Sequence, residues 1–151
     1  MKNEELARRA VACKGFRWLP GMRCTHRWTG GIRVLADDSG EQSEAYVVLP
    51  DADGNAVMTI DECGIMGGFP AAGSAYPFLP DLNDPATLGC LLALVREAWG
   101  DPALSVTAGY TKDRTVEWEV EHPHPDSLPE ALWTYFDTEA AALVAALEAA
   151  P

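Results

Sequence analysis

The sequence lacks the short motifs that mark common catalytic and cofactor-binding sites. It contains no Gly-x-Ser-x-Gly, no Gly-x-x-x-x-Gly-Lys-Ser/Thr and no Gly-x-Gly-x-x-Gly, so neither a serine nucleophile nor a nucleotide-binding loop is indicated. Cysteine catalysis needs a thiolate beside a base, and only Cys24 near His26, or Cys63, offers a starting point. The acids beside Cys63 disfavour its thiolate. We therefore predict a protein that is not an enzyme and needs no cofactor.

Long apolar runs and a secretion signal are also missing. The longest strongly apolar run, Leu88–Val95, is much too short to cross a bilayer. The first five residues include Glu4 and Glu5, where a signal peptide would have basic residues and then an apolar run. The four cysteines form no Cys-x-x-Cys pair and are expected to be reduced. These features predict a cytoplasmic protein with no membrane partner.

Positive charge is scarce beyond residue 36. The 151 residues carry a net charge of −12, but unevenly. Residues 1–36 hold eight Lys or Arg and two Glu, whereas residues 37–151 hold three Lys or Arg and 21 acids, a net charge of −18. Such asymmetry bears on partners and solubility rather than on the fold. It makes nucleic acid an unfavourable partner and favours a protein with a basic surface.

The stretch from Asp84 to Gly100 predicts the central helix of the fold. Asp84 is a good N-cap, Pro85 suits the first helical position, and Gly100 suits the left-handed residue after the helix. A helix that is apolar nearly all round is typical of a protein interior, so we expect residues 85–99 to be buried. One face carries large side chains for the sheet. The opposite face holds small residues, expected to be approached closely by the C-terminal helix: Ala86, Gly89, Cys90 and Ala93.

Apolar periodicity and turn residues predict the other elements. Helices are expected at residues 3–13 and 138–150, and a long Gly/Pro-rich loop at residues 64–84. Residues 127–136 are ambiguous, and we interpret them as a turn followed by a short strand. Together these elements predict a single α+β domain, residues 1–151, in which an antiparallel sheet (a meander plus a hairpin) packs on the central helix. The expected strands are residues 31–36, 44–49, 56–60, 104–110 and 115–121.

Three segments carry a resemblance to other proteins. They are VACKGFRWLPGM at residues 11–22, LPDLNDPATLGCLLALVREAWGDP at residues 79–102 and TEAAALVAALEAAP at residues 138–151. Together they resemble small uncharacterised proteins encoded by phages and prophages. The resemblance covers 50 of the 151 residues and brings with it no activity, ligand or catalytic residue. It implies an origin in a mobile element, where small acidic proteins often bind host machinery.

Acidic side chains are the leading candidates for a partner-binding surface. In the strand expected at residues 115–121, three glutamates occupy alternate positions and so share one face, roughly 6.6 Å apart. Such an array can compete with nucleic acid for a basic groove on another protein, for instance in a host defence complex. The alternative is a solvated face that keeps a small domain soluble. The candidate residues are Glu117, Glu119 and Glu121, with Asp37, Asp38, Glu41 and Glu44 in an acidic hairpin region.

A small metal- or nucleic-acid-binding module is the alternative function. Cys24, His26, His122 and His124 are suitable zinc ligands, although their one-residue spacings are not those of a zinc knuckle. Basic and aromatic residues interleave in residues 14–33, as in surfaces that bind single-stranded nucleic acid. The competing interpretation is that these arginines pair with the acidic remainder of the chain and that the aromatic rings complete the core.

Residues 51–62 place oxygen donors at five positions of a calcium-binding loop of the EF-hand type. However, Ala56 stands where that loop needs glycine, and Pro50 and a β-rich run precede it where a helix is required. We therefore interpret Asp53-Gly54-Asn55 as the turn of a hairpin, with incidental calcium binding left open.

Overall fold

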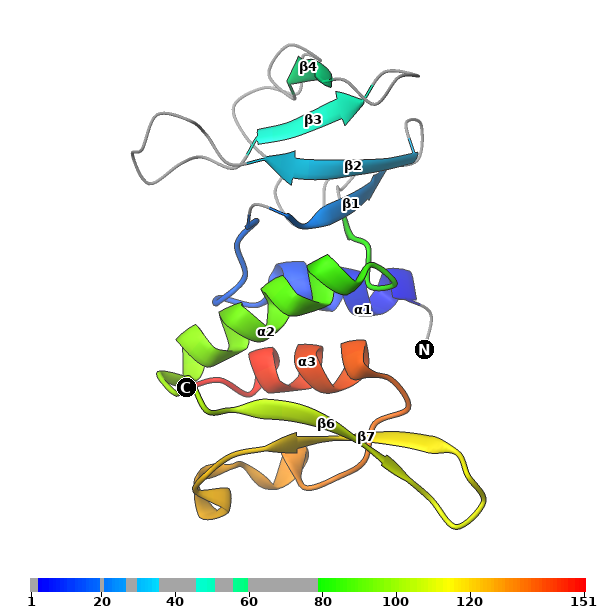
Figure 1. Cartoon of the computed structure of the whole chain (residues 1–151). Coiled ribbons are helices and arrows are strands. Elements are labelled where there is room, and N and C mark those ends of the chain that lie inside the picture. Colours follow the sequence, from blue (N-terminus) through cyan, green and yellow to red (C-terminus); the bar gives the residue numbers. More distant parts are fainter. Residues whose placement is uncertain (1–2, 20, 27–29, 36–45, 51–55, 60–78) are drawn as a thin grey trace. The chain divides into compact units, whose positions relative to one another are not determined.

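A computed structural model describes residues 3–19, 21–26, 30–35, 46–50, 56–59 and 79–151 (Figure 1). The chain forms two compact units, Met1–Arg17 with Leu88–Pro151, and Trp18–Thr87. The chain is α+β, as predicted. The described strands form two separate antiparallel sheets, so the expectation of one sheet is wrong. The single domain over residues 1–151 stays a prediction.

The unit Trp18–Thr87 contains a five-stranded antiparallel sheet with the strand order β4-β3-β2-β1-β5. The meander expected at residues 31–36, 44–49 and 56–60 is confirmed as β2, β3 and β4. The sequence did not predict the two further strands. One of them, β5, lies inside the expected loop 64–84 and pairs with β1. The strands are β1 (Arg23–His26), β2 (Gly30–Leu35), β3 (Tyr46–Pro50), β4 (Ala56–Thr59) and β5 (Leu79–Pro80).

The β3–β4 pairing decides between the two interpretations of residues 51–62. Leu49 lies opposite Met58, and Pro50 lies opposite Ala56. A strand therefore begins at Ala56, at the position where a calcium-binding loop would turn. The hairpin interpretation is confirmed, and its turn at residues 51–55 lies outside the described residues.

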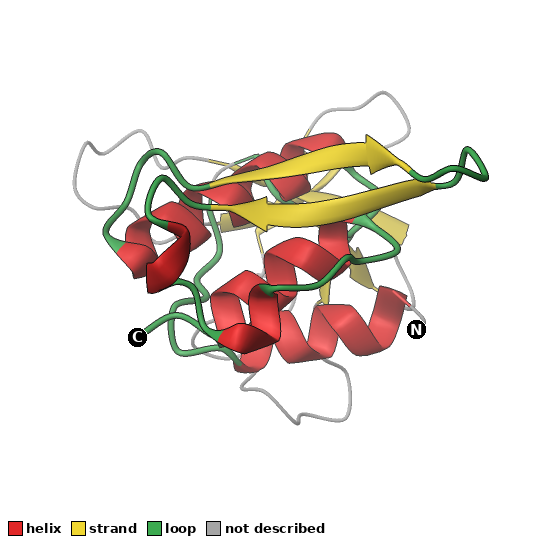
Figure 2. Cartoon of the chain, turned by 90° about the horizontal axis from the view of Figure 1, so that it is seen from below, coloured by secondary structure: helices red, strands yellow, loops and turns green. Residues whose placement is uncertain are grey.

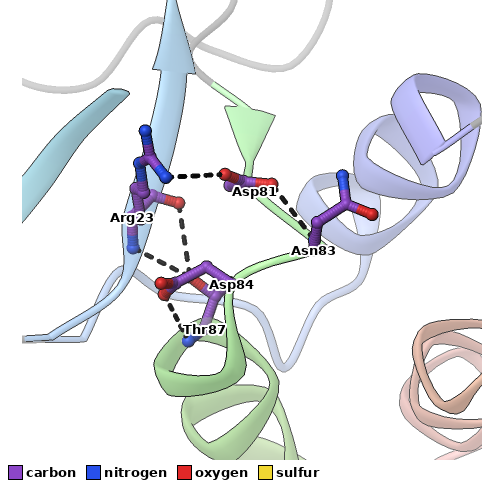
Figure 3. A network of polar contacts seen from close by, with 5 residues as sticks. All are labelled: Arg23, Asp81, Asn83, Asp84 and Thr87. Atoms are coloured by element: carbon purple, nitrogen blue, oxygen red, sulfur yellow. Dashed lines mark hydrogen bonds and ion pairs between the residues drawn. The ribbon is translucent and has the colours of Figure 1, made fainter. Parts of the chain in front are cut away.

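A network of hydrogen bonds fixes the start of α2 (Pro85–Trp99) against β1 (Figure 3). Asp84 Oδ2 accepts from both the backbone N–H and the hydroxyl of Thr87, at 3.0 and 2.9 Å. The Thr87 hydroxyl in turn accepts from the Arg23 N–H at 2.8 Å. Thr87 is fully buried, and its hydroxyl both donates and accepts, as a buried polar group should. The predicted N-cap at Asp84 is confirmed.

The other unit is built around α3 (Glu139–Glu148), which contacts α1 (Asn3–Ala12) and the β6–β7 hairpin (Figure 1). Thr138 caps α3 by accepting from the Ala141 N–H at 3.1 Å, as predicted for Asp137 or Thr138. The Arg9 guanidinium binds both carboxylate oxygens of Glu148, at 2.7 and 2.6 Å, and so joins α1 to the end of α3. The apolar core of α3 comprises Ala140, Ala142, Leu143, Val144, Ala146 and Leu147.

α2 is buried on one face only, which corrects the prediction of a helix buried all round. Its large face is covered, with Leu91, Leu94 and Val95 in the core. Its small face is open: Gly89 and Ala93 are exposed, and a Cβ added at Gly89 would meet nothing within 4 Å. The expected close approach of the C-terminal helix to this face is therefore wrong.

α2 ends as predicted, in a Schellman motif at Gly100. Gly100 has a φ of 64°, its N–H donates to Glu97 O, and the Asp101 N–H donates to Arg96 O, both at 3.0 Å. The Arg96 side chain continues the connection by donating from Nε to Leu104 O at 2.8 Å. The chain is thereby directed from α2 into β6.

The hairpin of β6 (Ser105–Tyr110) and β7 (Val116–Glu121) has a tight turn at residues 111–115. The Thr111 N–H donates to Thr115 O and the Arg114 N–H to Thr111 O, both at 3.0 Å. The hydroxyls of Thr111 and Thr115 lie 2.6 Å apart in a hydrogen bond. Arg114 has a φ of 60°, in the left-handed region that non-glycine residues adopt at a cost. Two 3₁₀ helices, η1 (Pro125–Ser127) and η2 (Glu130–Leu132), follow β7 (Figure 2).

Candidate partner-binding surface

The register of the β6–β7 hairpin brings the three predicted glutamates to one face. Glu121, Glu119 and Glu117 lie opposite Ser105, Thr107 and Gly109. Because side chains alternate across a strand, these six residues share one side of the hairpin, which we call the glutamate face. Val120 points to the other side, where it is buried and where the hairpin contacts α3.

The three glutamates differ in exposure. Glu121 is exposed, and its Oε1 accepts from the Thr107 hydroxyl at 2.9 Å. Glu117 and Glu119 are partly covered. The other candidates, Asp37, Asp38, Glu41 and Glu44, lie outside the described residues. Their contribution to an acidic surface stays a prediction.

The strand predicted after residue 127 is a single bridge at Phe136. The Trp118 N–H donates to Phe136 O at 2.8 Å, and the Phe136 N–H donates to Trp118 O at 2.7 Å. This antiparallel register sets Tyr135 beside Glu119 and on the same side of the sheet. Tyr135 is thus a member of the glutamate face that the sequence did not identify. The run Trp133-Thr134-Tyr135-Phe136 indicated a strand, but not which strand it would join.

A cavity of about 400 Å³ lies beside Glu119. Its lining includes two carboxylates, Glu119 and Asp126, and two aromatic residues, Trp133 and Tyr135. Trp133 and Tyr135 are 64% and 63% exposed, although large apolar side chains are usually covered. The remaining lining residues are Val120, Leu128, Leu132 and Thr134. We call this cavity, with its two carboxylates and two aromatic rings, the acidic–aromatic pocket.

His122 has both ring nitrogens occupied. Its Nε2 lies 2.9 Å from Asp101 Oδ2, and its Nδ1 lies 2.9 Å from both the backbone N and the backbone O of His124. A carboxylate can only accept, so the hydrogen bond to Asp101 is donated by Nε2. His122 is therefore unavailable as a general base at Nε2, and it holds the end of β7 against the loop after α2.

A larger and more open cavity of about 690 Å³ borders this histidine. Trp99, Asp101, His122 and Asp126 contribute to its lining. The Trp99 indole N–H donates to Ala146 O at 2.8 Å, so this ring is fixed between α2 and α3. Two of its lining residues, His122 and Asp101, contact each other.

The four residues of the proposed metal site do not lie in one unit. His122 and His124 follow β7, with ring centroids 6.0 Å apart, whereas Cys24 and His26 belong to β1 in the other unit. Within the described ranges, no three His, Cys, Asp or Glu side chains gather as metal ligands would. The side chains of Cys24 and His26 lie outside the described residues. The alternative of a metal site formed by all four residues therefore stays a prediction.

Two arginines of the basic segment 14–33 pair with acids. Arg17 binds Glu97 through two hydrogen bonds of 2.6 and 2.7 Å, and Arg23 Nη1 lies 3.6 Å from Asp81 Oδ2. Through its hydrogen bonds, Arg17 lowers the pKa of the Glu97 carboxyl. For these two arginines the interpretation as partners of the acidic remainder is confirmed. The side chains of Arg27 and Arg33 lie outside the described residues.

Comparisons with known proteins return no relative. No family model, no curated protein and no solved structure matches the sequence. Among the helices that the structure describes, none is both long and apolar enough to cross a membrane.

Proposed function

We propose that this protein is a non-enzymatic accessory protein that binds another protein through its acidic surface. The observation that carries the proposal is the one-sided charge of the glutamate face and its surroundings. Residues 115–151 contain eight Asp or Glu and no Lys or Arg, and three of those acids alternate along β7. Complementary charge of this kind speeds encounter and selects the partner more than it adds affinity. The partner is therefore a protein with a basic surface.

A more specific form of the proposal is that the partner protein normally binds nucleic acid. A row of carboxylates repeats negative charge along a line, as a nucleic-acid backbone does, and can occupy a groove that evolved for phosphates. We propose a cytoplasmic inhibitor, encoded by a phage or prophage, of a host defence complex that binds nucleic acid. This origin is the one implied by the resemblance that we predicted for residues 11–22, 79–102 and 138–151.

Capture from host lysate tests the proposal. The immobilised protein should retain a basic protein at low salt and release it at high salt, because exposed charges are screened within about 10 Å at 0.1 M salt. The captured protein should bind nucleic acid, and the soluble accessory protein should displace that nucleic acid. The triple variant Glu117→Gln, Glu119→Gln, Glu121→Gln should lose capture.

The matched control removes the same charge from elsewhere. A variant with Glu4→Gln, Glu5→Gln and Glu97→Gln also removes three exposed carboxylates, but none from the glutamate face. It should capture as well as the wild type. If both triple variants lost capture equally, the binding would depend on the net charge of the protein and not on the glutamate face. Failure of the wild type to capture any salt-sensitive basic protein would overturn the proposal.

A further inference from the structure

The acidic–aromatic pocket combines features that a merely solvated surface does not need. Its lining includes the buried residues Leu128 and Leu132 together with Trp133 and Tyr135, each of which is more than half exposed. Of the four large apolar residues that stand out as exposed in the described chain, these two border one cavity. Exposed aromatic rings grouped at a cavity are typical of a contact for a partner.

Among the described residues that line the pocket, two are acidic and none is basic. Glu119 of β7 and Asp126 of η1 are its two acidic lining residues. Neither carboxylate forms an ion pair with any residue that the structure describes. The nearest Lys or Arg before the pocket's segment is Arg114, and none follows it up to residue 151. A cation from outside the chain therefore has two carboxylates available to it.

We infer that the pocket receives an arginine side chain of the basic partner. A guanidinium is planar, stacks on aromatic rings and donates to carboxylates in a fixed geometry, so it can use Trp133 or Tyr135 and Glu119 or Asp126 together. A lysine ammonium is a more strongly hydrated point charge and uses the rings less well. A divalent metal would find only two carboxylate side chains in this lining, fewer than its usual oxygen ligands.

The cavity, at about 400 Å³, is large enough to admit an arginine side chain. The bridge between Trp118 and Phe136 holds Tyr135 beside Glu119, and Leu132 anchors η2 just before Trp133. The pocket is thus assembled from β7 and the segment that follows it. This inference rests on the proposed function, since it names the group by which the acidic surface engages its partner.

Calorimetric titration with three matched peptides tests the pocket. The probes are one Gly/Ser-rich peptide carrying arginines, the same peptide with lysines, and the same peptide with citrullines, which are uncharged but similar in shape to arginine. At low salt the arginine peptide should bind several-fold more tightly than the lysine peptide, and the citrulline peptide should not bind. Equal binding of the arginine and lysine peptides would overturn the inference that the pocket receives arginine. Binding would then be explained by a general acidic surface.

Variants locate the binding site. Glu119→Gln and Trp133→Ala should each weaken binding of the arginine peptide about tenfold or more. Glu117→Gln, which lies next to Glu119 on the glutamate face, should weaken binding less than Glu119→Gln does. The controls Glu4→Gln, an exposed carboxylate on α1, and Tyr110→Ala, a ring 80% exposed at the end of β6, should change affinity less than threefold. Trp133→Phe, which keeps a ring, should bind better than Trp133→Ala. Circular dichroism verifies that each variant is folded.

The outcomes separate this inference from the proposed function. If Glu117→Gln weakens binding as much as Glu119→Gln, and Trp133→Ala changes nothing, the pocket is wrong while an acidic binding surface stands. If the wild type binds neither a cationic peptide nor a basic protein at low salt, the proposed function itself fails.

Discussion

α2 and α3 have similar sequences but opposite environments. Both are rich in alanine and leucine, and each has a small-residue face. In α3 the small residues Ala142 and Ala146 are fully buried, because α1 lies on one side of the helix and the β6–β7 hairpin lies on another. In α2 the small residues Gly89 and Ala93 are exposed. Apolar composition therefore predicts that a helix has a buried face, but its neighbours decide how many faces are buried.

The largest expected effect comes from enlarging a small residue of α3. Ala146→Leu should lower the free energy of unfolding by roughly 2–3 kcal/mol, because the side chain has no room in a packed interior. Ala93→Leu, which adds the same atoms to the open face of α2, should change it by less than about 0.5 kcal/mol. Urea unfolding measures both. Similar losses for the two variants would mean that both helices are enclosed.

The N-caps of the two helices should differ in strength. Asp84→Ala removes the acceptor for two donors of Thr87, one of them a buried hydroxyl, and should cost about 1–2 kcal/mol. Thr138→Ala removes the acceptor of one N–H and should cost about 1 kcal/mol. Thermal unfolding compares them, with Asp84→Asn as the control that keeps an acceptor. A harmless Asp84→Ala would show that the network in Figure 3 contributes nothing to stability.

Two glycines should respond oppositely to alanine. Gly89→Ala should raise the free energy of unfolding by about 0.5–1 kcal/mol, because alanine favours the helix and the new Cβ meets no atom within 4 Å. At Gly15 a Cβ would lie 3.2 Å from Leu147 Cδ1 and 3.3 Å from Ala98 Cβ, so Gly15→Ala should destabilise. Destabilisation by Gly89→Ala would contradict the open face of α2.

The smallest expected effect is a dependence of stability on pH at the exposed end of α2. Arg17 lowers the pKa of Glu97 in the folded protein, so the folded state binds the Glu97 proton less readily than the unfolded state. The pair therefore contributes to the free energy of unfolding. This contribution is fully present above the pKa that Glu97 has in the unfolded protein, and it is lost as the pH falls through the lower pKa of the folded protein. Glu97→Gln should flatten that part of the acid unfolding profile slightly. An unchanged profile would show that the Arg17–Glu97 pair is energetically silent.

Local signals in the sequence predicted the elements well. Asp84 and Pro85 defined the start of α2, Gly100 its end, and the alternation in residues 116–121 both β7 and the shared face of its glutamates. Each of these features depends on a few neighbouring residues, whose conformational preferences are written in the chain itself.

Features that depend on distant residues were not predicted. The sequence could not show that Phe136 pairs with Trp118, and so it could not bring Tyr135 to Glu119. Nor did it show that β5 joins β1 or that the strands form two sheets. Pairing between distant segments is decided by the packing of the whole fold, which no local pattern records. The candidate pocket therefore emerged only from the structure, although Glu119 was already a candidate.

The turn at residues 111–115 has a consequence for the acidic residues of β7. A hairpin that folded one residue out of register would exchange the two faces of the strand. The glutamates would then point toward α3, and one of them would take the buried position of Val120, at a cost of several kcal/mol for an unpaired buried charge. The misregistered hairpin is thus excluded by its own charges. The glutamates that we assign to recognition therefore also favour the register seen in the structure.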